Sequence, residues 1–148
     1  MAVSSRLIDT NILVYAYDTS ETAKREVDVG IVREVWDRGG GVICLQNLFE
    51  CFVAVTGKVQ KPITFAAART IVSDILRSSR WLVIDRQAQT VMHAMDLVER
   101  TGTPYWDALI AACMLAHGVG TILTENERDF SKVPGITVIN PFKTSLRR

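Results

Sequence analysis

The sequence has few cysteines, and none of them is placed to form a pair. Cys44, Cys51 and Cys113 are odd in number, show no C-x-x-C spacing and lie in apolar runs. A free thiol in such surroundings behaves as a small hydrophobic group, and the pattern argues against a disulfide framework. We therefore expect buried, reduced cysteines and a cytoplasmic protein.

The chain also lacks an excess of charge of either sign and a long apolar segment. Its 148 residues include 17 Lys or Arg and 16 Asp or Glu, so no global basic field indicates a nucleic-acid partner. The most apolar run, 108–123, contains His117 and two glycines and falls short of the ~20 residues of a membrane span. Asp9 and Asn11 interrupt the apolar run near the N-terminus, which argues against a signal peptide. We expect no membrane association.

Several catalytic motifs are missing as well. The sequence contains no G-x-x-x-x-G-K-[ST], no G-x-G-x-x-G and no G-x-S-x-G. Nucleoside triphosphate, dinucleotide and serine-hydrolase chemistry therefore have no support. His93 and His117 stand alone, without the spacing of metal ligands, and are expected to be structural.

Short apolar runs alternate with longer helical patterns along the whole chain. Strands are predicted at 5–8, 42–45, 81–84, 121–124 and 137–139, with helical segments between them. This alternation is typical of an α/β domain with a mostly parallel sheet, and we expect one domain over residues 1–148. In the helix after the second strand, a stripe at i, i+3 and i+4 is expected to face the core: Leu45, Leu48, Phe49, Phe52 and Val53.

Three long stretches each contain a single charged residue, and each time it is a carboxylate. These are Asp9 in residues 7–17, Glu50 in 39–57 and Asp107 in 101–124. An ionised carboxylate in apolar surroundings is costly without compensation, and several brought together repel one another. A hard divalent cation with oxygen ligands would compensate them, so we expect a Mg²⁺ or Mn²⁺ site.

Each of these acids also has a simpler interpretation. Asp9 could be a helix N-cap, a position that favours Asp. Asp107 lies in the first turn of a helix, where the helix dipole stabilises a carboxylate. Glu50 has no Lys or Arg at i±3 or i±4, which excludes a local ion pair, but a distant cation could still pair with it.

A polar loop follows the fourth predicted strand. Residues 124–130 contain three acids and Asn126, and they could either complete a metal site or form an ordinary turn. Thr124 would offer a hydroxyl for positioning, and Phe130 would hold the loop to the core.

Four sequence blocks, taken in order, resemble the PIN domain, and more closely the VapC-type toxins of prokaryotic toxin–antitoxin pairs. The blocks are L-I-D-T-N-I-L-V-Y at 7–15, Q-x-x-x-E at 46–50, Y-W-D-A-L-I-A-A at 105–112 and T-x-N-x-x-D-F at 124–130. The resemblance implies a three-layer α/β fold, in which helices flank a five-stranded, mostly parallel sheet.

The resemblance also implies an activity, that of a Mg²⁺- or Mn²⁺-dependent endoribonuclease. Asp9, Glu50 and Asp107 match the acidic positions of the family. The fourth acidic role falls to Asp129, with Asn126 as a possible ligand through water. Asn11 and Thr124 match positions that orient the acids. The implied partners are an RNA substrate, an antitoxin protein and a second copy of the chain.

Two other functions remain open at this stage. The chain could be a catalytically silent PIN-like binding or assembly module, or a metal-dependent nuclease of structured DNA. Phosphates outside an acidic site need cations, and the candidates are Lys58, Lys61 and Arg128.

Overall fold

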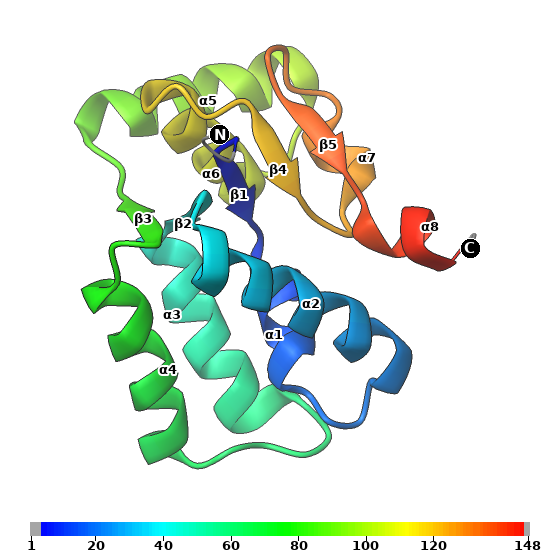
Figure 1. The fold of residues 1–148 in the computed structure, drawn as a ribbon. Helices are drawn as coiled ribbons and strands as arrows, with labels where there is room; N and C mark the ends of the chain where they lie inside the picture. Colours follow the sequence, from blue (N-terminus) through cyan, green and yellow to red (C-terminus); the bar gives the residue numbers. More distant parts are fainter. Residues whose placement is uncertain (1–3, 147–148) are drawn as a thin grey trace.

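The computed structural model describes residues 4–146 and contains one five-stranded parallel sheet (Figure 1). Its strands are β1 (Arg6–Ile8), β2 (Gly41–Cys44), β3 (Trp81–Ile84), β4 (Thr121–Leu123) and β5 (Thr137–Ile139), in the order β3-β2-β1-β4-β5. All five predicted strands are confirmed, with ends displaced by at most one residue. The chain winds outward from β1 to β3 and then returns to the other side of β1. Ligands of open parallel sheets bind at such a reversal, beyond the carboxyl ends of the strands.

Helices cover both faces of the sheet, which confirms the three-layer arrangement. One face packs against α5 (Ala88–Thr101) and α6 (Tyr105–Ala116), and its core includes Leu7. The other face, with Ile8, packs against the remaining long helices. These are α1 (Thr10–Tyr17), α2 (Thr22–Arg38), α3 (Leu45–Val53) and α4 (Phe65–Arg77). Shorter elements are the π-helix η1 (Ala54–Lys58), α7 (Glu127–Phe130) and α8 (Pro141–Leu146).

The inward face of α3 differs from the predicted stripe. Phe49 is 56% exposed and Val53 is 51% exposed, whereas Leu48 and Cys51 are buried. The expected stripe was too wide. The buried apolar face is narrow and runs from Leu48 through Cys51 of α3 to Val55 of η1, while one edge of the expected stripe is exposed to solvent. The prediction that Phe49 and Val53 face the core is therefore wrong.

A glycine allows α2 to approach the sheet closely. Gly39 and Gly40 have φ of 78° and 83°, which ends the helix in the left-handed region that glycine tolerates. A Cβ on Gly41 would lie 2.5 Å from Cγ1 of Val35, so this contact between α2 and β2 requires glycine.

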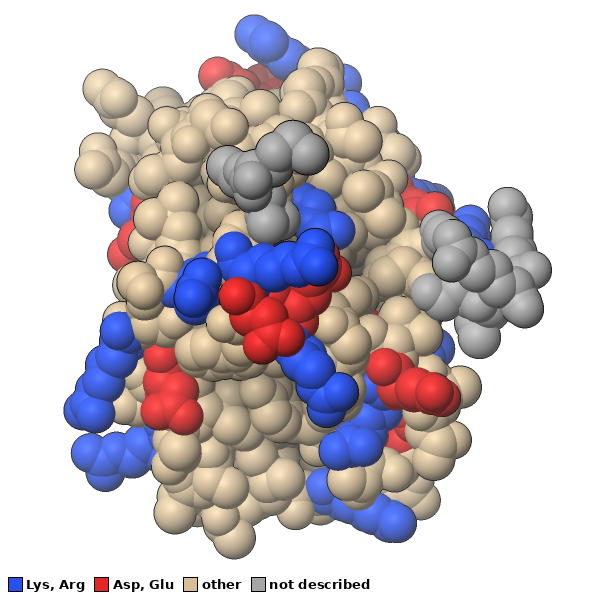
Figure 2. All heavy atoms as spheres, in the orientation of Figure 1, with Lys and Arg blue, Asp and Glu red and all other residues tan. Residues whose placement is uncertain are grey.

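The surface charges are mixed (Figure 2) and the cysteines are free, as the composition predicted. On the face shown in Figure 2, basic and acidic side chains are intermixed, and no broad field of one sign is seen. The three cysteines are free and buried, as predicted. Of the helices in residues 4–146, none has both the length and the apolar character to cross a membrane.

Candidate active site

Asp9 is the residue around which the site is built. It follows β1 and caps α1, and its Oδ1 accepts the Thr10 backbone N–H at 2.8 Å. Its Oδ2 accepts the Thr124 hydroxyl at 2.7 Å and the Asn11 amide at 3.3 Å. The side chain is buried, and the pKa of Asp9 is raised by this burial, by more than the hydrogen bonds from Thr124 and Thr10 lower it. Asp9 is thus an N-cap, and its carboxylate also faces a cavity.

The other two sequence-predicted acids face the same cavity. It has a volume of about 530 Å³ and is lined by Asp9, Glu50 and Asp107, from α3 and α6 as well as the end of β1. Asp107 is half-buried, and burial together with the charges of Asp9 and Asp129 raises its pKa to about 6. The three acids, far apart in sequence, are therefore close enough for their charges to interact.

Glu50 is held by neutral donors and not by a cation. Its Oε2 accepts the Thr10 hydroxyl at 2.8 Å, and its Oε1 accepts the Gln46 amide at 3.0 Å. Within residues 4–146 no Lys or Arg forms an ion pair with it, and Arg86 reaches only Gln46, at 3.3 Å. Glu50 is exposed, so the expectation of an apolar environment around it is wrong. Its carboxylate is free to act in the cavity.

The loop after β4 brings Asn126 to Asp107. Asn126 lines the cavity, and its Nδ2 donates to Asp107 Oδ2 at 3.2 Å. Asp129 does not line the cavity, and one of its oxygens lies 3.6 Å from the Lys132 ammonium. Its charge nevertheless contributes to the raised pKa of Asp107. Asp129 is thus close enough to act on Asp107 by its charge, but it is not among the residues that line the cavity.

Several supporting residues were not found from the sequence. Asn47, fully buried, donates to Asp9 Oδ1 at 3.2 Å and to Thr10 Oγ1 at 3.0 Å. A polar residue three positions before Glu50, in an otherwise apolar helix, was the available signal.

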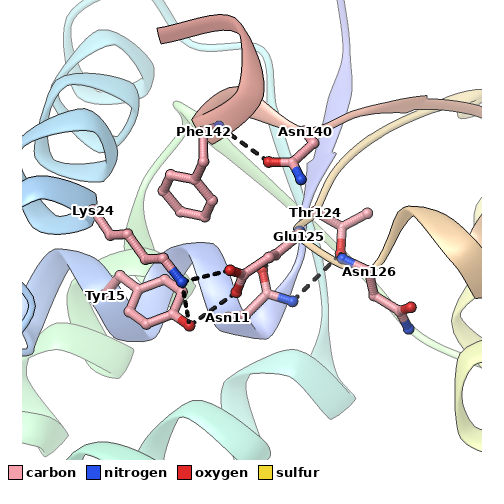
Figure 3. Close-up of polar contacts among 8 residues, drawn as sticks. All are labelled: Asn11, Tyr15, Lys24, Thr124, Glu125, Asn126, Asn140 and Phe142. Atoms are coloured by element: carbon pink, nitrogen blue, oxygen red, sulfur yellow. Dashed lines mark hydrogen bonds and ion pairs between the residues drawn. The ribbon is translucent and has the colours of Figure 1, made fainter. Parts of the chain in front are cut away.

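A second set of contacts holds the loop that carries Thr124 and Asn126 (Figure 3). The carboxylate of Glu125 accepts hydrogen bonds from the Tyr15 hydroxyl and the Lys24 ammonium, and its backbone N–H donates to Asn11 Oδ1 at 3.2 Å. Lys24 also lies 4.7 Å from the ring centroid of Tyr15 and 5.4 Å from that of Phe142. Helices α1, α2 and α8 thereby fix the loop beside Asp9.

The donor set fits a hard divalent cation. Carboxylate and amide oxygens at the cavity are the ligands that Mg²⁺ and Mn²⁺ prefer. In the part of the chain that the structure describes, no three acidic, histidine or cysteine side chains are close enough together to enclose a metal ion by themselves. Mg²⁺ commonly keeps several waters and takes only one or two protein carboxylates plus substrate phosphates. The mutual repulsion that raises the pKa of Asp107 is what such a cation would relieve.

Several solved structures are similar to this chain. A toxin–antitoxin complex from Klebsiella pneumoniae is similar with a TM-score of 0.68 and 23% identity, over 93% of this chain and 98% of that one. VapBC2 from Rickettsia felis, solved with a promoter DNA fragment, gives 0.62 and 24%, over 91% and 97%. VapC20 of Mycobacterium tuberculosis, described as a sarcin-ricin loop cleaving toxin, gives 0.65 and 14%, over 86% and 94%. At these identities the likeness shows a shared fold.

Sequence comparison supplies the family. A search of curated proteins finds no match. The family model described as PIN domain matches residues 6–136, which is most of the chain and includes Asp9, Glu50, Asp107 and Asp129. The chain therefore belongs to the PIN domain family.

Proposed function

We propose that this protein is a divalent-metal-dependent endoribonuclease and the toxin of a toxin–antitoxin pair. The observation that carries the proposal is the set of three carboxylates, Asp9, Glu50 and Asp107, on one cavity at the carboxyl edge of the sheet. Their charges act on one another, and none of the three forms an ion pair within residues 4–146. Such a site would repel RNA unless a cation compensates it.

Roles for the residues follow from their positions. Asp9 and Asp107 are proposed to hold the cation, and Glu50 to hold it or to orient the attacking water. Asp129 would act on Asp107 by its charge, and Asn126 by its bond to Asp107. Asn11 and Thr124 fix the rotamer of Asp9. When bound, the cation supplies positive charge for the phosphate oxygens and makes water more acidic.

The comparisons support the biological setting. The PIN domain match and the solved toxin–antitoxin structures agree with a nuclease toxin that an antitoxin inhibits. VapC20 is described as a sarcin-ricin loop cleaving toxin, which agrees with RNA as the proposed substrate class. The exposed apolar residues of α3 and α4 offer surface for an antitoxin or a second copy: Phe49, Val53, Phe65 and Leu76.

The test is cleavage of end-labelled single-stranded RNA, transfer RNA and flap DNA in Mg²⁺, Mn²⁺ and EDTA. We expect RNA cleavage with either metal, none in EDTA, and at least a 100-fold loss in Asp107→Asn. Asp96→Asn, which changes an exposed acid on α5, is the matched control and should cleave like wild type. Equal rates for wild type and Asp107→Asn would end the assignment, and cleavage of flap DNA alone would replace RNA with structured DNA. A folded protein that is inactive on all substrates would instead favour a silent binding module.

A further inference from the structure

Lys58 lines the cavity that contains the three acids. The cavity is lined by Asp9, Glu50 and Asp107 and also by Lys58, Val59 and Gln60. Among the described residues that line it, Lys58 is the one lysine or arginine. We propose that Lys58 is a phosphate-binding residue, which holds a backbone phosphate of a bound RNA strand other than the one that is cleaved. This inference rests on the proposed function.

A π-turn places Lys58 on the side of the helix that faces the cavity. Helix α3, which carries Glu50, continues without a break into the π-helix η1, and Val59 N–H donates to Ala54 O at 3.1 Å. In a regular α-helix, eight residues would turn Lys58 about 80° past the direction of Glu50. A π-turn holds more residues per turn and therefore turns each of them less. Single π-turns of this kind are often found at functional sites.

The backbone around Lys58 is held on both sides. The Thr56 hydroxyl donates to Phe52 O at 2.7 Å, and Val55 is buried in the core. After the turn, Ile63 N–H donates to Val55 O at 2.9 Å, which closes the loop behind Lys58. The ammonium group is thus carried on a fixed backbone while the side chain stays exposed.

The charges around Lys58 leave it free for a phosphate. Within residues 4–146 no ion pair joins Lys58 to an acid, whereas Lys24, near the same cavity, is paired with Glu125. Five carboxylates line the cavity, namely Asp9, Asp18, Glu21, Glu50 and Asp107. A polyanion that enters such a cavity needs a fixed positive charge beside the metal site, because the rest of the wall repels it. Lysine serves as a point charge for phosphate.

The experiment compares Lys58→Met with Lys61→Met and Lys58→Arg. Lys61 is also exposed and lies three residues further on, but it does not line the cavity, so it is the matched control. Binding of a fluorescent RNA of ten nucleotides is followed by anisotropy over a series of KCl concentrations, with Ca²⁺ in place of Mg²⁺ and Mn²⁺ so that the strand stays intact. The constants kcat and KM are measured on the same strand in Mg²⁺.

We expect Lys58→Met to weaken RNA binding about tenfold and to reduce the slope of log affinity against log salt by about 0.7, as loss of one phosphate contact on a single strand does. KM should rise while kcat changes less than threefold, and Lys58→Arg should restore binding. Calorimetric Mn²⁺ affinity without RNA, and the melting temperature, should stay at wild-type values.

Three results would overturn the inference. An unchanged salt slope in Lys58→Met would show that no phosphate contact was lost. Equal losses in Lys58→Met and Lys61→Met would indicate a diffuse surface field. A changed Mn²⁺ affinity or melting temperature would assign Lys58 to neutralising the acids of the cavity. The binding assay does not depend on cleavage. An inactive wild type would therefore refute the proposed function, while the role of Lys58 in RNA binding could still be measured.

Discussion

Asn47 donates its side-chain N–H to Asp9, with Nδ2 3.2 Å from Oδ1. The second N–H of the same amide donates to the Thr10 hydroxyl, which in turn donates to Glu50 at 2.8 Å. The amide oxygen accepts the backbone N–H of Cys44 at 3.1 Å, so every polar atom of this buried side chain is used. Asn47 thus links the acid after β1 to the acid on α3 through one short chain of hydrogen bonds.

We predict that Asn47→Leu lowers RNA cleavage 10- to 100-fold, which is the usual cost of losing a partner that orients a ligand. The affected step is the placement of Asp9, so Mn²⁺ affinity measured by calorimetry should fall as well. Thr10→Val, which leaves the bond from Asn47 to Asp9 in place, should cost less than tenfold.

Since Asn47 also caps α3 through Cys44, thermal unfolding is recorded for each variant. A folded Asn47→Leu protein with wild-type cleavage and Mn²⁺ affinity would contradict the positioning role.

Sequence patterns predicted the strands and the three acids, but they did not predict the role of Asn47. The five strands were predictable because each is a short apolar run between longer helical patterns. Asp9, Glu50 and Asp107 were identifiable because each is the only charge in a long stretch. The edge of a helix stripe is different, since whether Phe49 faces core or solvent depends on how closely α3 packs on its neighbours. The partner of a buried amide is likewise a tertiary fact, and Asn47 could be found only in the fold.

The two remaining acidic candidates should differ in their effect on the metal. Asp107 lines the cavity, whereas Asp129 lies outside its lining and within 3.6 Å of Lys132. We predict that Asp107→Asn abolishes measurable Mn²⁺ binding in calorimetry, and that Asp129→Asn weakens it about tenfold or less, because Asp129 acts only through its charge. Asp96→Asn serves as the control for loss of one negative charge on the surface. Equal losses in Asp107→Asn and Asp129→Asn would place Asp129 among the direct ligands.

Lys24 is predicted to stabilise the fold more than an ordinary surface lysine. Its ammonium contacts Glu125 and the rings of Tyr15 and Phe142, as Figure 3 shows for the pair with Glu125. We expect Lys24→Met to lower the free energy of unfolding by about 1 kcal/mol, from an ion pair and cation–π contacts that are partly exposed. Lys132→Met removes a partly exposed ion pair with Asp129 and should cost at most about 0.5 kcal/mol, the contribution of an ion pair alone. Urea unfolding measures both changes in the free energy of unfolding. Equal changes would show that Lys24 stabilises the fold no more than Lys132 does.

The burial of Asp28 should make the stability of the protein depend on pH. It lies on α2 with none of its surface exposed, and neither of its carboxylate oxygens has a hydrogen-bond partner. Burial, with a smaller contribution from the charge of Glu125, raises its pKa to about 8. In the unfolded chain the pKa of the same group is near 3.8, the ordinary value for an aspartate. Between these two pKa values, Asp28 is therefore protonated in the folded protein and ionised in the unfolded chain.

The sign of the pH dependence follows from this difference. Between about pH 4 and pH 8 unfolding releases the proton, so the contribution of Asp28 to stability falls as the pH rises through this range and is constant above it. Asp28→Asn, which stays neutral throughout, should be more stable than wild type by about 1–3 kcal/mol at pH 8 and nearly equal to it at pH 4.5. The control is Asp37→Asn, which changes an exposed acid in the same helix and should show no such trend. Urea unfolding at several pH values gives the difference directly, and a difference that does not grow with pH would mean that Asp28 is ionised in the folded protein.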